Sequence, residues 1–225
     1  MLVAALVAAL AVGGAVAFVV LGNGGDGPTP TPVPTTTVVV TQAPTPTPTS
    51  SQPPTPPPPT ASNITWAAYG ASASSALDAG GGASYGADNL LDGSTKTCWS
   101  EGVGGYGEGE YVDIEFSETV VLTRFELVPG YLKYDSQEGV DRWWSNGRLA
   151  ELELSFSDGT SESFTLDDRK GWHTFQLDEP HTDQVRMTIV DAFPHTDEWG
   201  DHAADDTSVS EVRFYGWPES EEGGY

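Results

Sequence analysis

The 225-residue chain carries 33 acidic side chains against nine basic ones, which gives a formal net charge of −24. A nucleic-acid-binding protein needs a basic face that displaces counterions from phosphates, and the sequence shows no cluster of lysines or arginines that would form one. The same charge disfavours adsorption to an anionic membrane surface and leaves neutral ligands, cations and basic surfaces as the expected partners.

Residues 2–21 form an uninterrupted apolar run without a charged side chain. A run of about 20 apolar residues is long enough to cross the hydrocarbon core of a membrane as a helix. The alternative is a cleaved signal peptide with Ala15-Val16-Ala17 as its cleavage site, but the basic segment that should precede it is missing and the apolar run continues beyond it. We therefore expect a single-pass anchor, while cleavage would make the protein secreted.

Residues 23–61 are rich in Pro and Thr and show no apolar periodicity. Such a composition favours extended polyproline geometry rather than a packed core. Stalks of this kind are typical of cell-surface proteins, so the sequence predicts that the domain beyond it lies outside the cell. Residues 218–225 form a short acidic tail.

Residues 62–217 change to short runs in which apolar and polar residues alternate, divided by Gly, Asp, Ser and Pro. This period of two predicts strands with one wet face, and no segment sustains the 3.6-residue period of a helix. The tripeptide Ser157-Asp158-Gly159 predicts a hairpin turn. We expect an all-β antiparallel sandwich or jelly roll with one core. The predicted strands lie at 112–116, 120–128, 152–156, 162–166, 174–177, 185–189 and 209–215.

Residues 85–116 read YGADNLLDGSTKTCWSEGVGGYGEGEYVDIEF. In this order the residues resemble the discoidin, or coagulation factor V/VIII C-type, domain. Further strings narrow the resemblance to the branch found as the translocation, glycan-binding domain of bacterial NAD glycohydrolases. The resemblance implies a galactose-binding-like jelly roll that binds glycan and does no chemistry. Those strings are Gly130-Tyr131, Asn146-x-Arg148, Leu166-x-Asp168 and Asp206-Thr207-x-x-Ser210-Glu211. The sequence departs from the family pattern at Pro129, where the pattern has Asn, and at 135–144, where the segment is longer than in the pattern.

Aromatic rings stack on sugar faces while neighbouring polar groups bind the hydroxyls, and two adjacent Trp residues lie in a segment whose composition predicts a loop. We expect one of the two to pack and the other to bind. Arg148 is equally compatible with a structural ion pair to a loop carboxylate. The predicted ligand-binding residues are Glu101, Tyr131, Trp143, Trp144, Asn146 and Arg148.

The resemblance also implies a structural calcium ion at the Asp92-Gly93 turn. The matching oxygen ligands are Asn89 (through its carbonyl), Asp92, Thr97 and Glu211, a set that suits a hard cation. Since Ser94 stands where a second carboxylate is common, and since Asp-Gly turns occur in every β protein, an ordinary turn explains the motif equally well.

Two acidic segments invite other interpretations. Glu108-Gly109-Glu110 resembles a paired catalytic carboxylate, but no complete catalytic set accompanies it, so an NAD-consuming enzyme or a glycosidase is disfavoured. The segment at 195–206 combines two His with five carboxylates in a spacing that fits a solvated acidic loop, with a weak cation site as the alternative. A third possibility for the whole chain is the sensor or protein-interaction ectodomain of a longer envelope protein.

Overall fold

The computed structural model describes residues 59–78, 80 and 84–222. The predicted membrane anchor at 2–21, and the predicted stalk at 23–61 apart from its last three residues, lie outside these ranges. Within them, no helix combines the length and the apolar character needed to cross a membrane.

The described chain is dominated by β-structure, as predicted. It contains one short α-helix, α1 (Arg142–Ser145), and four 3-10 turns, η1 (Thr65–Ala67), η2 (Ala87–Leu90), η3 (Asp197–His202) and η4 (Glu219–Glu221). The strands are β1 (Ser62–Asn63), β2 (Ala68–Ala73), β3 (Trp99–Ser100), β4 (Tyr111–Val128), β5 (Tyr134–Asp135), β6 (Val140–Asp141), β7 (Gly147–Phe156), β8 (Ser161–Thr165), β9 (His173–Gln176), β10 (His181–Phe193), β11 (Thr207–Val209) and β12 (Glu211–Pro218).

The long strand β4 organises the sandwich. The strand order is β1-β12-β4-β10-β7-β11-β3, with β2 and β9 also paired to β4 and β8 paired to β7. The first half of β4 pairs with β2, its second half pairs with β12 and β9, and β10 pairs with the first half and with Val120 and Val121. β4 is therefore the strand that links the partners of its first half to the partners of its second half in one sheet.

The core follows the predicted alternation. On β4, Val112, Ile114 and Phe116 are buried while the residues between them are partly exposed, and β7 and β10 repeat this pattern. The edge of the Phe116 ring meets the Phe214 ring of β12, with centroids 5.4 Å apart. The Ser157-Asp158-Gly159 turn joins β7 and β8 as an antiparallel hairpin, and Gly159 supplies the positive φ of 88° that the turn needs.

Two predicted boundaries were wrong. The strands expected at 112–116 and 120–128 are one strand, because the chain stays extended through the exposed Ser117 and Glu118. The strand expected at 209–215 is divided at Ser210. The hydroxyl of that residue donates to the Gly130 carbonyl at 2.8 Å and accepts from the Leu132 N–H at 3.0 Å, so it ties β11 and β12 to the segment after β4.

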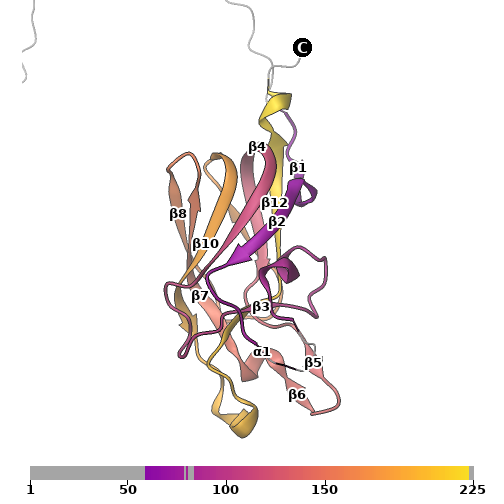
Figure 1. The fold of residues 1–225 in the computed structure, drawn as a ribbon, viewed down its shortest axis with the longest axis vertical. Helices are drawn as coiled ribbons and strands as arrows, with labels where there is room; N and C mark the ends of the chain where they lie inside the picture. The colour runs from indigo at the N-terminus through magenta and orange to yellow at the C-terminus, as the bar shows by residue number, and fades with distance from the viewer. Residues whose placement is uncertain (1–58, 79, 81–83, 223–225) are drawn as a thin grey trace, which may run out of the picture. The chain divides into compact units, whose positions relative to one another are not determined.

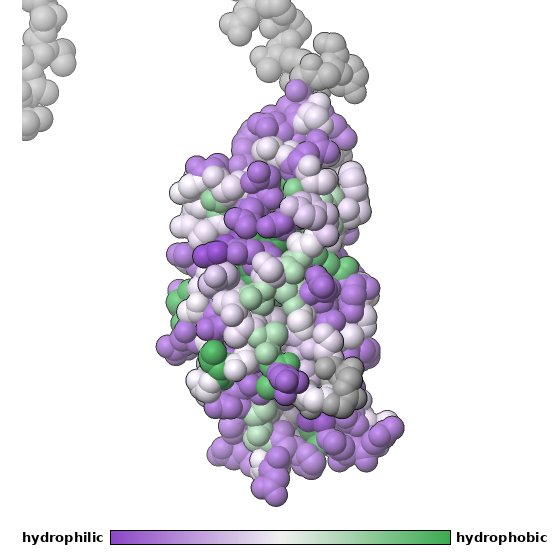
Figure 2. All heavy atoms as spheres, in the orientation of Figure 1, coloured by the Kyte–Doolittle hydropathy of each residue, from purple (hydrophilic) through white to green (hydrophobic). Residues whose placement is uncertain are grey.

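The two ends of the sandwich differ. In Figure 1, β1 and η4 lie at the top, whereas α1, the β5–β6 hairpin and the orange 3-10 turn η3 lie at the bottom. We call this lower end the loop end. On the face drawn in Figure 2 it is mostly hydrophilic, and apolar residues form only small groups. The loop end thus includes α1, which carries the Trp pair predicted to bind ligand.

Candidate functional site

Arg148 anchors the interior of the loop end. Its side chain is 2% exposed, and its Nε and Nη2 donate to the two carboxylate oxygens of Asp168 at 2.8 and 2.9 Å. Its Nη1 donates to the Asn146 carbonyl at 2.9 Å. The buried guanidinium therefore forms a two-point ion pair with a partly exposed carboxylate, which is the structural alternative left open by the sequence.

The Trp pair lies in α1 rather than in a loop, because the Asp141 carboxylate accepts from the Trp143 N–H and caps a helical turn. Trp143 is fully buried. A Cβ atom on Gly130 would lie 2.9 Å from the Trp143 ring, so this ring needs glycine beside it. Trp144 is half-buried, and its ring lies near two cations, Arg148 at 5.1 Å and Lys170 at 5.7 Å. Trp143 is thus the packing member of the pair.

Glu101 holds the glycine-rich segment in place. Its carboxylate is buried and accepts from the Val103 N–H at 2.8 Å and the Thr207 N–H at 3.0 Å. Burial raises the pKa of Glu101 above its ordinary value, although the two backbone donors lower it. A Cβ on Gly107 would lie 2.4 Å from the Glu101 side chain, so glycine is required at that close approach.

Asn146 and Tyr131 are also engaged internally. Asn146 donates to the Ser208 hydroxyl at 3.3 Å and accepts from the Ser145 hydroxyl at 3.1 Å. The Tyr131 hydroxyl donates to the Lys96 carbonyl at 3.1 Å. Buried side chains bonded in this way do not reach a ligand in this conformation. Of the six residues predicted to bind ligand, Glu101, Tyr131, Trp143, Asn146 and Arg148 are buried, and only Trp144 is partly exposed.

The four residues matched to a calcium site lie close together around the Asp92 turn. Asp92 accepts from the Thr97 hydroxyl at 2.7 Å. The Nδ2 of Asn89 donates to the Ser84 and Cys98 carbonyls, which leaves the carbonyl oxygens of Asn89 for an ion. The geometry keeps the candidate ligands together on three separate segments of the chain.

Glu211 is the residue that tests whether this set fits an ion. It is 2% exposed, and its Oε2 atom is buried without a hydrogen-bond partner among the described residues. Burial and the nearby Asp92 carboxylate raise the pKa of Glu211 to about 7. An unpartnered buried carboxylate oxygen beside a second carboxylate is what an absent cation would neutralise, so the donor set fits Ca²⁺.

The structure also brings together residues that the sequence did not single out. A pocket at the loop end is lined by Lys96, Leu132, Lys133, Tyr134, Asp141 and Lys170. These six include all three lysines of the chain. The three lysines lie on different loops, so they are separated in the sequence and only the fold brings them to one pocket. The one sequence feature that could have indicated this pocket is that all three lysines lie in predicted loops.

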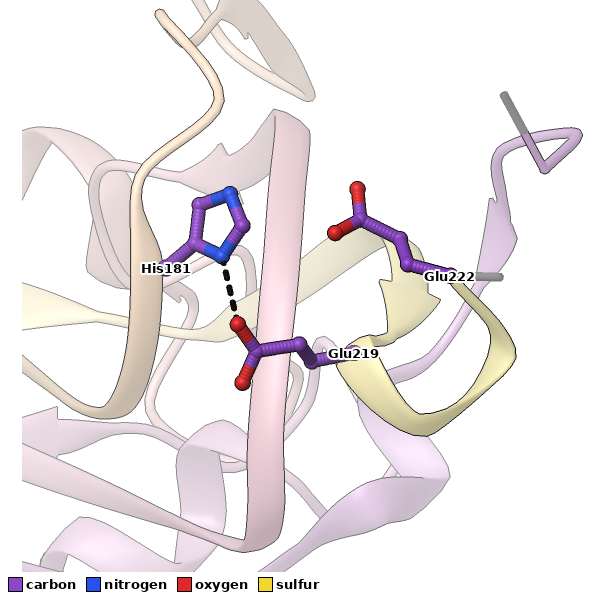
Figure 3. A group of neighbouring side chains, drawn as sticks. All are labelled: His181, Glu219 and Glu222. Carbon is purple, nitrogen blue, oxygen red and sulfur yellow. Dashed lines mark hydrogen bonds and ion pairs between the residues drawn. The ribbon is translucent and has the colours of Figure 1, made fainter. Parts of the chain in front are cut away.

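A separate group of metal-ligating side chains lies near the opposite end, where η4 follows β12. Figure 3 shows His181, at the start of β10, facing Glu219 and Glu222. The Nδ1 atom of His181 lies 2.9 Å from a Glu219 oxygen, and one ligand atom of each of the three lies within 4.8 Å of the others. All three side chains are exposed, and the contact ties η4 to β10.

The acidic segments considered as catalytic or cation sites have structural roles. Glu110 accepts from the Ser74 hydroxyl at 2.6 Å immediately before β4 begins. In the segment at 195–206, η3 forms a turn beside α1, and Asp205 accepts from the Gly105 N–H at 2.9 Å. These contacts hold loops together.

The model of the NAD glycohydrolase translocation F5/8 type C domain family matches residues 65–215. No curated protein matches the chain.

Solved structures share the fold. The family 32 CBM from Clostridium perfringens NanJ, determined in complex with galactose, has a TM-score of 0.50 and 15% identity over 69% of this chain and 99% of that one. The CBM32-1 and CBM32-2 domains from C. perfringens ZmpB have a TM-score of 0.50 and 13% identity over 68% of this chain and 36% of that one. At such identities the likeness shows the fold alone.

Proposed function

The chain belongs to the NAD glycohydrolase translocation F5/8 type C domain family, and from this membership we propose that its folded part is a carbohydrate-binding module that does no chemistry of its own. The observation that carries the proposal is the family match across residues 65–215, together with a fold shared with a carbohydrate-binding module in complex with galactose. A shared fold does not fix a ligand, which depends on the residues of the loop end.

Trp144 is the aromatic residue best placed to contact a sugar. Its indole is half-buried on α1, so it combines a fixed position with an accessible part of the ring. The buried neighbours Trp143 and Arg148 keep α1 in place beneath it. A rigid aromatic surface loses little side-chain entropy on binding, which favours contact with the apolar face of a sugar.

Calcium has a structural part in this proposal. Asp92, Thr97, Glu211 and a carbonyl of Asn89 would hold the ion, which supplies positive charge to two carboxylates that otherwise repel each other. The ion would join the turn after η2 to the start of β12, and therefore stabilise the domain rather than contact the glycan.

The N-terminal segments would attach the module to the outside of the cell membrane. Residues 2–21 would anchor the chain in the cell membrane, and the stalk at 23–61 would carry the domain outside it. β1, where the sandwich begins, lies at the end opposite the loop end (Figure 1). Cleavage of the first segment would release the same module as a secreted protein.

The test is a panel of immobilised neutral and acidic glycans, probed with the full chain in detergent, with calcium and with EDTA. We expect retention on a subset of the panel. Retention on none of the glycans under either condition would reject the proposed function, and equal thermal stability with calcium and EDTA would reject the calcium site.

A further inference from the structure

The lysine pocket at the loop end concentrates positive charge in an acidic protein. Lys96 follows η2, Lys133 follows β4 and Lys170 follows β8, so three separate loops contribute the three lysines to the lining of one cavity. The chain has 33 acidic side chains and three lysines, and random placement would leave each lysine among carboxylates. The pocket therefore departs from the charge of its surroundings.

Two of these lysines are not neutralised by a carboxylate. Lys170 pairs with Asp141, but within the described ranges Lys96 and Lys133 form no ion pair. The Lys96 amine instead donates to the Leu132 carbonyl at 3.0 Å, and the Lys133 amine lies 5.7 Å from the centre of the Tyr131 ring. Lys96 and Lys133 therefore keep positive charges that a bound anion would neutralise.

The acidic residues nearest the pocket are already occupied. Arg142, which follows β6, pairs with both Asp135 and Glu138. Asp141 caps α1 and pairs with Lys170. These pairs reduce the repulsion that an approaching anion would otherwise meet from the hairpin.

The pocket also offers a surface for a sugar ring. Tyr134 is 62% exposed and lines the cavity beside the lysines. Lys170 connects the cavity to the proposed contact residue, because its amine lies 5.7 Å from the Trp144 ring. An exposed aromatic ring beside unpaired ammonium groups matches a sugar that carries an acidic substituent.

We propose that the glycan bound at the loop end is acidic, and that Lys96, Lys133 and Lys170 hold its carboxylate or sulfate groups. This inference rests on the proposed function and names the ligand class of the same site. Because an ammonium group is a compact point charge with three donors, it accepts either kind of oxyanion. The rest of the strongly negative surface would repel such a polymer, so the pocket also fixes where it binds.

The experiment compares matched polymers at fixed calcium concentration. The full chain is tested for retention on polygalacturonate against its methyl ester, and on dextran sulfate against dextran. We expect at least one acidic polymer to bind more tightly than its neutral partner, and binding to weaken as sodium chloride is raised from about 50 to 500 mM. The two pairs distinguish carboxylate from sulfate.

The variants locate the effect. Lys133→Gln should weaken retention on the acidic polymer about fivefold, and Lys133→Arg should retain most of it. The control Arg186→Gln removes one positive charge from a partly exposed residue of β10 that pairs with Asp113, and should change retention by less than about twofold.

Three outcomes would overturn the inference. Equal retention on acidic and neutral polymers would leave the proposed function intact and reject the acidic ligand. Equal losses in Lys133→Gln and Arg186→Gln would reject the pocket. Retention on DNA equal to that on the acidic polymer would show general anion adsorption. Failure to bind any polymer, acidic or neutral, would instead count against the proposed function itself.

Discussion

Arg148 donates to both carboxylate oxygens of Asp168, at 2.8 and 2.9 Å, from a side chain that is 2% exposed. Removing the partly exposed Asp168 leaves the buried guanidinium without its counter-charge, which costs about 2 kcal/mol or more. We expect Asp168→Ala to lower the free energy of unfolding by about that amount, as measured by urea denaturation. Since a single ammonium group cannot reproduce the two-point geometry, Arg148→Lys should also lower the free energy of unfolding relative to wild type. A wild-type denaturation midpoint in either variant would contradict this role.

Trp143 is predicted to act through packing. Its indole is fully buried, so Trp143→Ala would leave a cavity and lower the free energy of unfolding by about 3–5 kcal/mol. Urea denaturation of the variant measures this change. Trp144→Ala, which removes a half-exposed ring from the next position, is the matched control and should cost much less. Equal losses in the two variants would contradict the division of roles.

Calcium binding is predicted to act through Glu211. Calcium should raise the midpoint of thermal unfolding of the wild-type chain, and EDTA should lower it. Glu211→Gln should abolish the response to calcium. In EDTA, however, this variant should be more stable than wild type at pH 8, on the order of 2 kcal/mol, because it removes a buried charge next to Asp92. A calcium response that survives in Glu211→Gln would contradict the assignment.

The contact between His181 and Glu219 predicts a pH dependence. The hydrogen bond that the His181 ring donates to the Glu219 carboxylate holds the pKa of His181 above its ordinary value. A raised histidine pKa means that the contact stabilises the fold below the unfolded pKa of about 6.5, and that this contribution is lost as pH rises through the raised value. Both side chains are about half exposed, so we expect a small effect on stability.

The measurement for this contact is an NMR titration of the His181 ring. Glu219→Gln should lower the pKa of His181, while Glu221→Gln removes a neighbouring charge and should change it less. An unchanged His181 pKa in Glu219→Gln would contradict the contact.

The sheet was predictable from local pattern because burial on one face imposes a period of two. The runs around Ile114, Leu154 and Met187 alternate without interruption, and each lies in a core strand. The continuity of β4 was not predictable, since Ser117 and Glu118 are exposed and resemble a turn in sequence.

The candidate site was harder to predict because burial is a tertiary property. Trp143 and Trp144 are chemically identical neighbours, and only the direction of α1 determines which one packs. Arg148 follows the Trp pair as a sugar-binding residue would, yet its partner Asp168 lies on another loop. The lysine pocket escaped detection for the same reason, since its three charges are adjacent only in the folded chain.

The most direct test of glycan binding at the loop end compares the partly exposed Trp144 with an exposed tryptophan elsewhere in the domain. Wild type, Trp144→Ala and Trp66→Ala are measured side by side on every glycan that retains the wild-type chain. Trp66 is 70% exposed in η1, next to β1, and so serves as the control. The account predicts that Trp144→Ala loses about tenfold or more in affinity while Trp66→Ala stays within about twofold of wild type. Unchanged binding in Trp144→Ala, or an equal loss in Trp66→Ala, would contradict it.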